Sequence, residues 1–378
     1  MKIAIFGGSF NPVHVEHVNI AAAAKRALGL DKIIIVPSYI TPQKQGRLTA
    51  TASDRLNLCR LAFEGIEGAE VSDYEILQGG VSYSYKTCAA LKQKYPADEL
   101  YFILGADMLE NFRFWKNPEQ ILDCVTLAVC AREDEEGLKK AVADFKSHFN
   151  RDIKLIGYTG AAVSSTAIRT LAALGADVCD YLPENAANYV KEHALYLQPN
   201  LAKVKNYLTP ERFNHTLGVA QTAVRNCCLA GVDELTALTA AALHDCAKYL
   251  NKDSKELQGF DFPADVPPPV VHQFSGAYVA QHTFGITDEA ILNAIKYHTS
   301  GRPNMTDLEK LIFLSDMLEP SRTFKGVQTL RKIFKEDLNA CMLAALAVQL
   351  EYLKSTGGEI YPLTQKAYEY FKGLKNDK

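Results

Sequence analysis

Short apolar runs alternate with stretches of helical periodicity over the first half of the chain. Five of these runs are bounded by Gly, Pro, Asp or Asn and have the length of buried strands: residues 3–6, 32–36, 100–104, 125–129 and 153–156. Helical patterns fill residues 13–28, 53–64, 84–94, 117–123 and 136–148. Because strand and helix alternate steadily, the pattern predicts right-handed crossovers and an α/β fold with a doubly wound parallel sheet.

The pattern changes near residue 200. Beyond Pro199-Asn200 we find helical periodicity and no convincing strand. Thr209-Pro210 is a helix N-cap with proline at the first helical position, and Thr306 forms a capping box with Glu309. We therefore expect two domains, an α/β domain over residues 1–198 and an all-α domain over residues 203–378.

Composition and charge narrow the function classes. Of 378 residues, 48% are hydrophobic and 22% are charged, which excludes a disordered or collagen-like chain. The 41 basic and 44 acidic residues leave a formal charge of −3, so no general field exists to hold nucleic acid or an anionic membrane. Any phosphate binding must be local, and we expect small-molecule nucleotides as partners.

The cysteines and the N-terminal residues indicate a reducing cellular compartment. The nine cysteines are scattered without a CxxC pair of zinc-site spacing, so they are typical of small core residues in a reducing environment. The apolar run before the first glycine pair, residues 3–6, has only four residues and is too short for a signal-peptide core, and no apolar run approaches the ~18 to 20 residues of a membrane span. We expect a cytoplasmic protein without a membrane partner, in which a homo-oligomer remains possible.

A candidate phosphate site follows the first predicted strand. Gly7 and Gly8 would let the backbone approach a ligand at the carboxyl end of that strand. His14 and His17, three residues apart, are predicted to share one face of the next helix's first turn, where the positive helix terminus favours a polyphosphate. The alternative is a plain tight turn with two surface histidines.

A second phosphate-binding pattern follows the fifth predicted strand. Ser164, Ser165 and Thr166 open a helix whose first amides are free, and Arg169 lies within one turn of them. Amides, hydroxyls and a guanidinium together bind a phosphate oxyanion. The alternative, a helix N-cap, needs only one of the three hydroxyls.

These motifs carry a family resemblance. GGSFNPVHxxH, SSTxIR and the strand that ends in Gly105-Ala106-Asp107 resemble the bacterial nicotinate-nucleotide adenylyltransferases, over roughly residues 1–198. The resemblance implies adenylyl transfer from ATP to nicotinate mononucleotide with Mg²⁺ assisting, a reaction that needs positioning and charge neutralisation but no protein nucleophile.

The same resemblance implies roles for individual residues. His14 and His17 would donate to the phosphates, Lys44 and Arg169 would neutralise the leaving side, and the hydroxyls of residues 164–166 would cradle it. Further contacts to ATP are implied for Gly7, Gly8, Ser9, Phe10, Gly105, Asp107, Ser164, Ser165 and Thr166. Tyr83, Ser84 and Trp115 would contact the pyridine nucleotide, although a lone Trp at such a position is equally typical of plain packing.

Three positions depart from the family pattern. Glu16 replaces a glycine between the two histidines, Gln43 replaces a histidine before Lys44, and Ala131-Arg132-Glu133-Asp134 replaces an Arg-Pro-Gly segment. A carboxylate at residue 16 would repel a triphosphate, point away from it or hold Mg²⁺. These departures keep open the alternative that the N-terminal half is a nucleotide-binding sensor that regulates the C-terminal half.

The helical half carries a cluster of metal-ligand types. The members are His215, His244, Asp245, His272, His298 and Asp316. Such groups at core-facing helix positions are costly unless they pair or bind metal, so six of them favour a metal site over satisfied core residues.

The order of these residues resembles the HD-domain metallophosphohydrolases. Leu243-His244-Asp245-x-x-Lys248, the segment from Tyr297 to Pro303 and the segment from Phe313 to Pro320 narrow the resemblance to bacterial symmetrical diadenosine-tetraphosphate hydrolases, over about residues 203–375. It implies one metal held by His215, His244, Asp245 and Asp316, and a second held by His272, His298 and a bridging Asp245. Nitrogen and carboxylate ligands suit iron or manganese, and we expect iron. Lys248, Arg302 and Arg322 are implied phosphate contacts, with Lys248 in a catalytic role.

The sequence thus predicts a fusion of two enzymes. The first would make nicotinate adenine dinucleotide and pyrophosphate, and the second would split diadenosine tetraphosphate into two ADP with two divalent transition metal ions. Another nucleotidyl acceptor for the first half, and a dNTP or (p)ppGpp as substrate of the second, are the alternatives within the same architecture.

Overall fold

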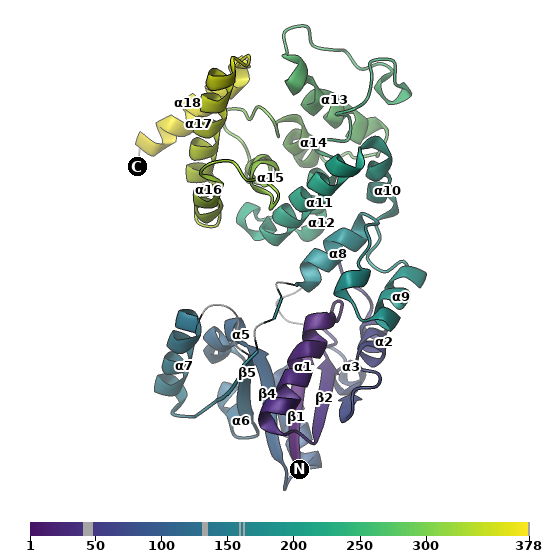
Figure 1. The fold of residues 1–378 in the computed structure, drawn as a ribbon, viewed down its shortest axis with the longest axis vertical. Helices are drawn as coiled ribbons and strands as arrows, with labels where there is room; N and C mark the ends of the chain where they lie inside the picture. The colour runs from purple at the N-terminus through teal and green to yellow at the C-terminus, as the bar shows by residue number, and fades with distance from the viewer. Residues whose placement is uncertain (41–47, 131–134, 159, 162, 377–378) are drawn as a thin grey trace. The chain divides into compact units, whose positions relative to one another are not determined.

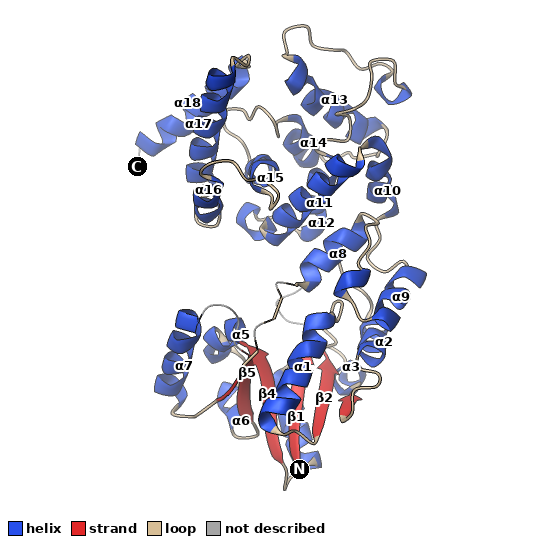
Figure 2. Ribbon diagram, in the orientation of Figure 1, coloured by secondary structure: helices blue, strands red, loops and turns tan. Residues whose placement is uncertain are grey.

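The structure is a computed structural model that describes residues 1–40, 48–130, 135–158, 160–161 and 163–376. The chain divides into two compact units (Figure 1). The first comprises residues 1–45, 49–168 and 178–195, and the second comprises residues 46–48, 169–177 and 196–378. Figure 2 shows strands in the first unit and helices in both.

A six-stranded parallel sheet forms the centre of the first unit. Its strands are β1 (Lys2–Gly8), β2 (Lys32–Pro37), β3 (Ala69–Val71), β4 (Glu99–Gly105), β5 (Thr126–Cys130) and β6 (Lys154–Ile156). They run in the order β3-β2-β1-β4-β5-β6, and every pairing is parallel. Ile5 pairs with Ile34 on one side and with Phe102 on the other, so the strand that ends in the glycine pair lies at the centre. The predicted doubly wound α/β fold is confirmed.

Helices connect these strands. They are α1 (Val15–Leu28), α2 (Ala52–Ala62), α3 (Tyr74–Gln78), α4 (Ser84–Lys94), α5 (Ala106–Glu110), α6 (Pro118–Leu122), α7 (Glu135–Phe149), α8 (Ser165–Ala173) and α9 (Glu184–Glu192). The five helices expected from periodicity are present with ends shifted by one or two residues. Four elements were not predicted from the sequence: β3, α3, α5 and α9. The first three have only three to five residues and are too short to show a period.

The second unit is built from helices, and the predicted all-α character is confirmed for its described residues. The helices are α10 (Pro199–Ala202), α11 (Pro210–Arg225), α12 (Glu234–Leu243), α13 (Pro268–His282), α14 (Glu289–Lys296), α15 (Asp307–Leu318), α16 (Val327–Phe334), α17 (Leu338–Thr356) and α18 (Pro362–Asn376). Thr209 and Thr306 cap α11 and α15 as expected, since their side chains accept from Arg212 N and Glu309 N.

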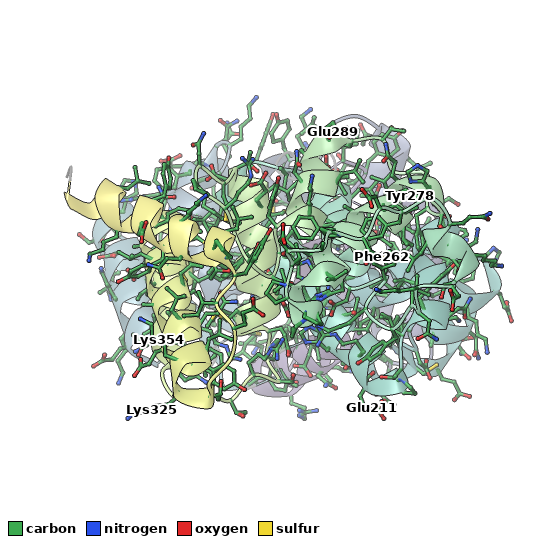
Figure 3. All side chains as sticks on the ribbon, turned by 90° about the horizontal axis from the view of Figure 1, so that it is seen from above. Glu211, Phe262, Tyr278, Glu289, Lys325 and Lys354 are labelled. Carbon is green, nitrogen blue, oxygen red and sulfur yellow. The ribbon has the colours of Figure 1, made fainter. Side chains whose placement is uncertain are left out.

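The core of this unit is apolar and its outside is charged. Leu311, Ile312 and Leu314 of α15 are fully buried within it. Charged side chains such as Glu211 and Lys354 lie at the periphery (Figure 3). Within the described ranges, the chain contains no helix with the length and apolarity required to span a membrane.

The helix α8 contributes to the second unit. Its last residue, Ala173, belongs to the helical core together with Leu201 and Val204, and the carbonyl of Ala173 accepts from Gln198 N at 3.0 Å. Residues 178–195 then return to the first unit. The segment around residue 170 therefore packs with helices that lie beyond residue 196.

Candidate functional site

The end of β1 and the loop that follows it are tightly packed. A Cβ atom on Gly7 would lie 3.3 Å from the ring of Phe102, and one on Gly8 would lie 3.1 Å from the ring of Phe10. These contacts give both glycines a packing reason, and close approach of a ligand stays a prediction. Buried Arg55, on α2, donates to the carbonyl of Ser9 at 2.7 Å and thereby anchors the same loop.

The two histidines of the motif lie against one another. His14 precedes α1 with an extended backbone (φ −141°, ψ 171°), so it is the N-cap and not a residue of the first turn as expected. The reason is a hydrogen bond from the His14 backbone N–H to Nδ1 of His17, at 3.1 Å. The ring centroids are 3.7 Å apart.

This hydrogen bond fixes the tautomer of His17. Since Nδ1 accepts, the ring proton of the neutral imidazole resides on Nε2. A histidine that donates through Nε2 at a helix N-terminus suits a phosphate oxygen.

The second motif meets the first inside the α/β unit. The Ser165 hydroxyl donates to the carbonyl of Pro12 at 2.9 Å, which places the start of α8 beside the loop after β1. Ser164 accepts from Ala167 N at 3.2 Å and therefore serves as the N-cap of α8. Ser164 is thus used for capping and Ser165 for the contact with Pro12. Ser165 and Thr166 are both half-buried in the first turn of α8.

The carboxylate of Glu16 is engaged within the unit. It is buried, and it accepts from the Tyr158 hydroxyl at 2.9 Å and from the Asn19 side-chain amide at 3.2 Å. A Cβ atom on Gly160 would overlap Oε2 of Glu16, so a larger residue at position 160 would require the Glu16 carboxylate to shift. Of the three possibilities for Glu16, these contacts favour a side chain turned toward Tyr158.

Arg169 is held inside the helical unit. Its guanidinium donates to both carboxylate oxygens of Glu234, at 2.9 and 2.8 Å, and both side chains are buried. The sequence analysis assigned Arg169 to phosphate and did not identify Glu234, because the partners are 65 residues apart and no local spacing connects them.

The remaining predicted residues of this half have varied surroundings. Trp115 packs its ring against Phe102 and Phe112, with centroids 6.0 and 5.2 Å apart, as the packing alternative expects. A Cβ atom on Gly105 would lie 2.6 Å from Asp107 Oδ1 in the first turn of α5. Tyr83 is half-buried before Ser84, the first residue of α4. Lys44, Gln43 and residues 131–134 lie outside the described residues.

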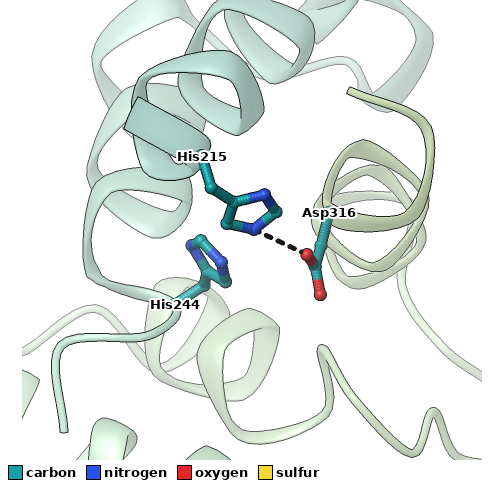
Figure 4. Close-up of side chains that lie close together, drawn as sticks. All are labelled: His215, His244 and Asp316. Carbon is teal, nitrogen blue, oxygen red and sulfur yellow. Dashed lines mark ion pairs between the residues drawn. The ribbon is translucent and has the colours of Figure 1, made fainter. Parts of the chain in front are cut away.

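The six predicted metal ligands converge within the helical unit. His215 is on α11, His244 and Asp245 directly follow α12, His272 is on α13, His298 follows α14 and Asp316 is on α15. Figure 4 shows His215, His244 and Asp316 directed toward one another. The possible ligand atoms of these three residues lie within 4.8 Å of one another, as do those of His244, Asp245 and His298.

Asp245 connects two groups of ligands. Its Oδ2 lies 3.2 Å from Nε2 of His244, and its Oδ1 lies 3.2 Å from Nε2 of His272 and 3.5 Å from Nε2 of His298. On the far side of His244, Nε2 of His215 lies 2.9 Å from Oδ1 of Asp316. The geometry therefore suits two adjacent cations with Asp245 between them.

The histidine tautomers also suit a metal. Nδ1 of His244 lies 2.6 Å from the carbonyl of Ala241, and Nδ1 of His298 lies 2.7 Å from that of Ile295. Because a carbonyl only accepts, Nδ1 carries the proton and Nε2 presents its lone pair. Nε2 of His244 is fully buried and makes no hydrogen bond with any of the described residues, which fits an atom reserved for a metal.

At neutral pH, most side chains of the cluster are in the protonation state that binds a metal. Burial lowers the pKa of His244 and brings that of His272 to about 4, so both imidazoles are neutral. Burial alone would raise the pKa of Asp245, but His244 and the other facing imidazoles outweigh it and hold that pKa well below its usual range. Neutral imidazole and ionised carboxylate are the forms that bind metal.

His215 differs from the other histidines. Its burial favours the neutral form, but hydrogen bonds with Asp316 and Glu319 outweigh burial and raise its pKa. Burial would raise the pKa of Asp316, which is instead lowered mainly by its hydrogen bond with His215. A cation at Nε2 would replace the proton shared by this pair.

Cationic side chains border the cluster. Lys248 Nζ lies 3.2 Å from Oδ1 of Asp245, and Arg322 donates to Oδ1 of Asp316 at 2.8 Å. Arg302, the third predicted phosphate contact, donates to both carboxylate oxygens of buried Glu309 and lies over the ring of Tyr297.

Three neighbours of the cluster were missed by the sequence analysis. The guanidinium of Arg212 contacts Oδ2 of Asp245, the Thr299 hydroxyl lies 3.2 Å from Nε2 of His272, and Glu319 contacts His215. Arg212 is one helical turn before His215, and Glu319 follows Asp316 by the same spacing. That spacing is the signal that could have identified two of them.

Family models match both halves of the chain. A cytidylyltransferase-like model matches residues 5–171, and an HD-domain model matches residues 212–321. The two matches correspond to the α/β unit and the helical unit in turn.

Relatives match each half and also the whole. A protein of Mycoplasma genitalium named "Probable nicotinate-nucleotide adenylyltransferase/Ap4A hydrolase" is 30% identical over 91% of this chain and 97% of its own length. A Clostridium tetani protein named "Probable nicotinate-nucleotide adenylyltransferase" is 37% identical over 52% of this chain and 98% of its own length. A Halalkalibacterium halodurans protein named "Bis(5'-nucleosyl)-tetraphosphatase, symmetrical" is 39% identical over 44% of this chain and 92% of its own length.

Proposed function

The chain belongs to the family of fused nicotinate-nucleotide adenylyltransferase/Ap4A hydrolases, and from this premise we propose that it carries both activities. The α/β unit transfers an adenylyl group from ATP to nicotinate mononucleotide and releases pyrophosphate. The helical unit hydrolyses diadenosine tetraphosphate symmetrically to two ADP. The observation that carries the proposal is the convergence of six ligand-type side chains, most of them buried, in one cluster, in a chain that aligns with a fused relative over nearly its whole length.

For the hydrolase, His215, His244, Asp245 and Asp316 would hold one divalent ion, and His272, His298 and Asp245 a second. When bound, such a pair supplies Lewis acidity toward water and phosphate oxygens. The protein keeps the imidazoles neutral and the carboxylates ionised, and Lys248 and Arg322 bring positive charge to where a phosphate would lie. Water attacks a phosphorus next to the central bridging oxygen, the bond to that oxygen breaks, and each half leaves as ADP.

Nitrogen and carboxylate donors without a thiolate suit iron or manganese. The thiol nearest in sequence, Cys246, is fully buried and lies 3.4 Å from the carbonyl of Gly276. We propose iron as the resident metal.

For adenylyl transfer, the nucleotide phosphate attacks the α-phosphorus of ATP, and the bond to the β-phosphate breaks as pyrophosphate leaves. The protein positions the reactants and offers donors to the phosphates. His17 carries its ring proton on Nε2, and half-buried Thr166 lies in the first turn of α8. Mg²⁺ would enter with ATP.

Asp245→Asn tests the hydrolase half, because it removes the carboxylate that faces both groups of ligands. We expect loss of hydrolysis and a fall in bound metal, while adenylyl transfer persists. Retention of both metal and hydrolysis would place the reaction elsewhere. Adenylyl transfer is its own control in the same sample.

A second candidate function is favoured by the pairing of Arg169. Because Glu234 holds this guanidinium inside the helical unit, the α/β unit would lack one phosphate contact and could serve as a nucleotide-binding sensor. ATP binding without release of pyrophosphate would support the sensor. Formation of nicotinate adenine dinucleotide at a rate typical of enzymes, about 1 s⁻¹ or more, would exclude it.

A further inference from the structure

Glu319 lies at the end of α15, three residues after the metal-ligand candidate Asp316. It is 1% exposed, although Pro320 and Ser321 beside it are both exposed. A buried carboxylate at a helix end is costly unless its oxygens are satisfied. The contacts of the Glu319 carboxylate therefore decide how its burial is compensated.

The carboxylate of Glu319 accepts from two neighbours. Nδ1 of His215 lies 3.1 Å from Oε1, the Ser321 hydroxyl donates to the same oxygen, and the Ser321 backbone N–H donates to Oε2 at 2.7 Å. Since an ionised carboxylate only accepts, Nδ1 of His215 carries a proton, and Nε2, which faces Asp316, is the nitrogen at which a cation would replace the proton shared with Asp316.

The surroundings leave this carboxylate little freedom. On α11, one turn after His215, a Cβ atom on Gly218 would lie 2.8 Å from Oε2 of Glu319. From α16, Arg331 donates to the carbonyl of Glu319 at 2.6 Å and to that of Leu318 at 2.9 Å. Helices α11, α15 and α16 together fix the position from which Glu319 reaches His215.

Glu319 differs from the partners of other histidines in the cluster. His244 and His298 direct Nδ1 at backbone carbonyls of their own chain segments, three residues earlier. His215 instead has a charged partner from a different helix. A carboxylate behind an imidazole orients the ring, fixes its tautomer and raises its basicity as a ligand.

We infer that Glu319 is a positioning residue of the metal centre, which holds His215 in the orientation and tautomer that bind the metal also facing His244 and Asp316. The inference rests on the proposed metallohydrolase function. Nothing in it requires Glu319 to touch substrate or metal.

The test uses the full chain, stripped of metal and titrated with Mn²⁺ alone, with free Mn²⁺ measured by electron paramagnetic resonance. Glu319→Gln keeps the shape but places an NH₂ group against either His215 or Ser321. Against His215, the amide donates to Nδ1 and moves the ring proton to Nε2, where it blocks the metal. We expect one of two Mn²⁺ ions to bind about 10- to 100-fold more weakly, and the other to keep its affinity.

Two further variants make the result specific. Glu309→Gln is the matched control, because Glu309 is also a 1% exposed carboxylate on α15 but pairs with Arg302. It should leave both Mn²⁺ affinities at wild-type values. Ser321→Ala, at an exposed position, removes one donor to Glu319 and should weaken the binding of the same Mn²⁺ ion to a smaller degree.

The outcomes separate the inference from the proposed function. A wild-type chain that binds no Mn²⁺ would overturn the metallohydrolase assignment itself. Two ions bound with wild-type affinity in both Glu319→Gln and Ser321→Ala would overturn only the role of Glu319. Equal weakening in Glu309→Gln would also overturn it, because any lost buried carboxylate would then have the same effect. If Glu319→Gln does not fold, Ser321→Ala alone decides between these results.

Discussion

His17 and Glu16, neighbours in the first turn of α1, face different partners. His17 accepts from the backbone of His14 and carries its ring proton on Nε2, whereas Glu16 accepts from Tyr158 and Asn19. Adjacent helix positions are separated by about 100°, which allows one turn to hold both. The types and spacing of these residues could be predicted from sequence, but the tautomer and the partners could not, since they come from backbone geometry and from a residue 142 positions away.

His17→Ala removes the imidazole that we propose as a donor to a phosphate oxygen. We expect adenylyl transfer to fall by roughly 10²-fold or more, a size typical of losing one preorganised donor, with hydrolysis unchanged. Steady-state rates of both reactions on one preparation provide the measurement. A transfer rate close to that of the wild-type chain would show that His17 only caps α1.

Glu16→Gln tests whether this carboxylate holds Mg²⁺. Because its oxygens accept from Tyr158 and Asn19, we expect the Mg²⁺ concentration that supports half-maximal transfer to stay the same. Titration of the transfer rate with Mg²⁺ measures this directly. An increased Mg²⁺ requirement would mean that Glu16 turns toward the nucleotide.

At the scale of elements, strands with continuous apolar runs and helices with caps were predictable, and short edge elements were not. The three residues of β3 include exposed Glu70, so they carry neither an apolar run nor a full alternation. The helix positions of the metal cluster followed from the sequence because Thr209 and Thr306 set where α11 and α15 begin. The distance between those helices at Gly218 and Glu319 follows from tertiary packing, which no local pattern encodes.

Helices α8 and α12 are joined by the buried pair of Arg169 and Glu234. Removing one partner leaves a buried charge without compensation, so Glu234→Gln should lower the free energy of unfolding by about 3 to 5 kcal/mol. The double variant Arg169→Met with Glu234→Leu should be less destabilised than Glu234→Gln. Urea unfolding followed by circular dichroism measures both, and a Glu234→Gln chain as stable as wild type would contradict the pairing.

At the scale of the molecule, the change from α/β to all-α was predictable from the loss of strand patterns near residue 200. The exact division was not, because Ala173 and Leu174 pack into the helical core while residues 178–195 belong to the α/β unit. Hydrophobic contacts formed across such sequence distances leave no mark on local periodicity.

The stability of C-terminal fragments tests where the helical unit begins. A helical fragment of residues 203–378 lacks Ala173, Leu174 and Leu201, whereas a fragment of residues 165–378 retains these core residues. We expect the shorter fragment to have the lower thermal midpoint, because lost apolar burial costs about 25 cal/mol per Å². Equal midpoints would show that the segment around residue 170 contributes no stability.

The central claim is that two separate sites on one chain catalyse two reactions. The most direct measurement is the set of nucleotide products, separated by chromatography, that the full chain forms from diadenosine tetraphosphate and from ATP with nicotinate mononucleotide. We predict ADP alone from the first and nicotinate adenine dinucleotide from the second, with Asp245→Asn abolishing only the ADP and His17→Ala suppressing only the dinucleotide. Formation of AMP and ATP from diadenosine tetraphosphate, or loss of both reactions in either variant, would contradict the account.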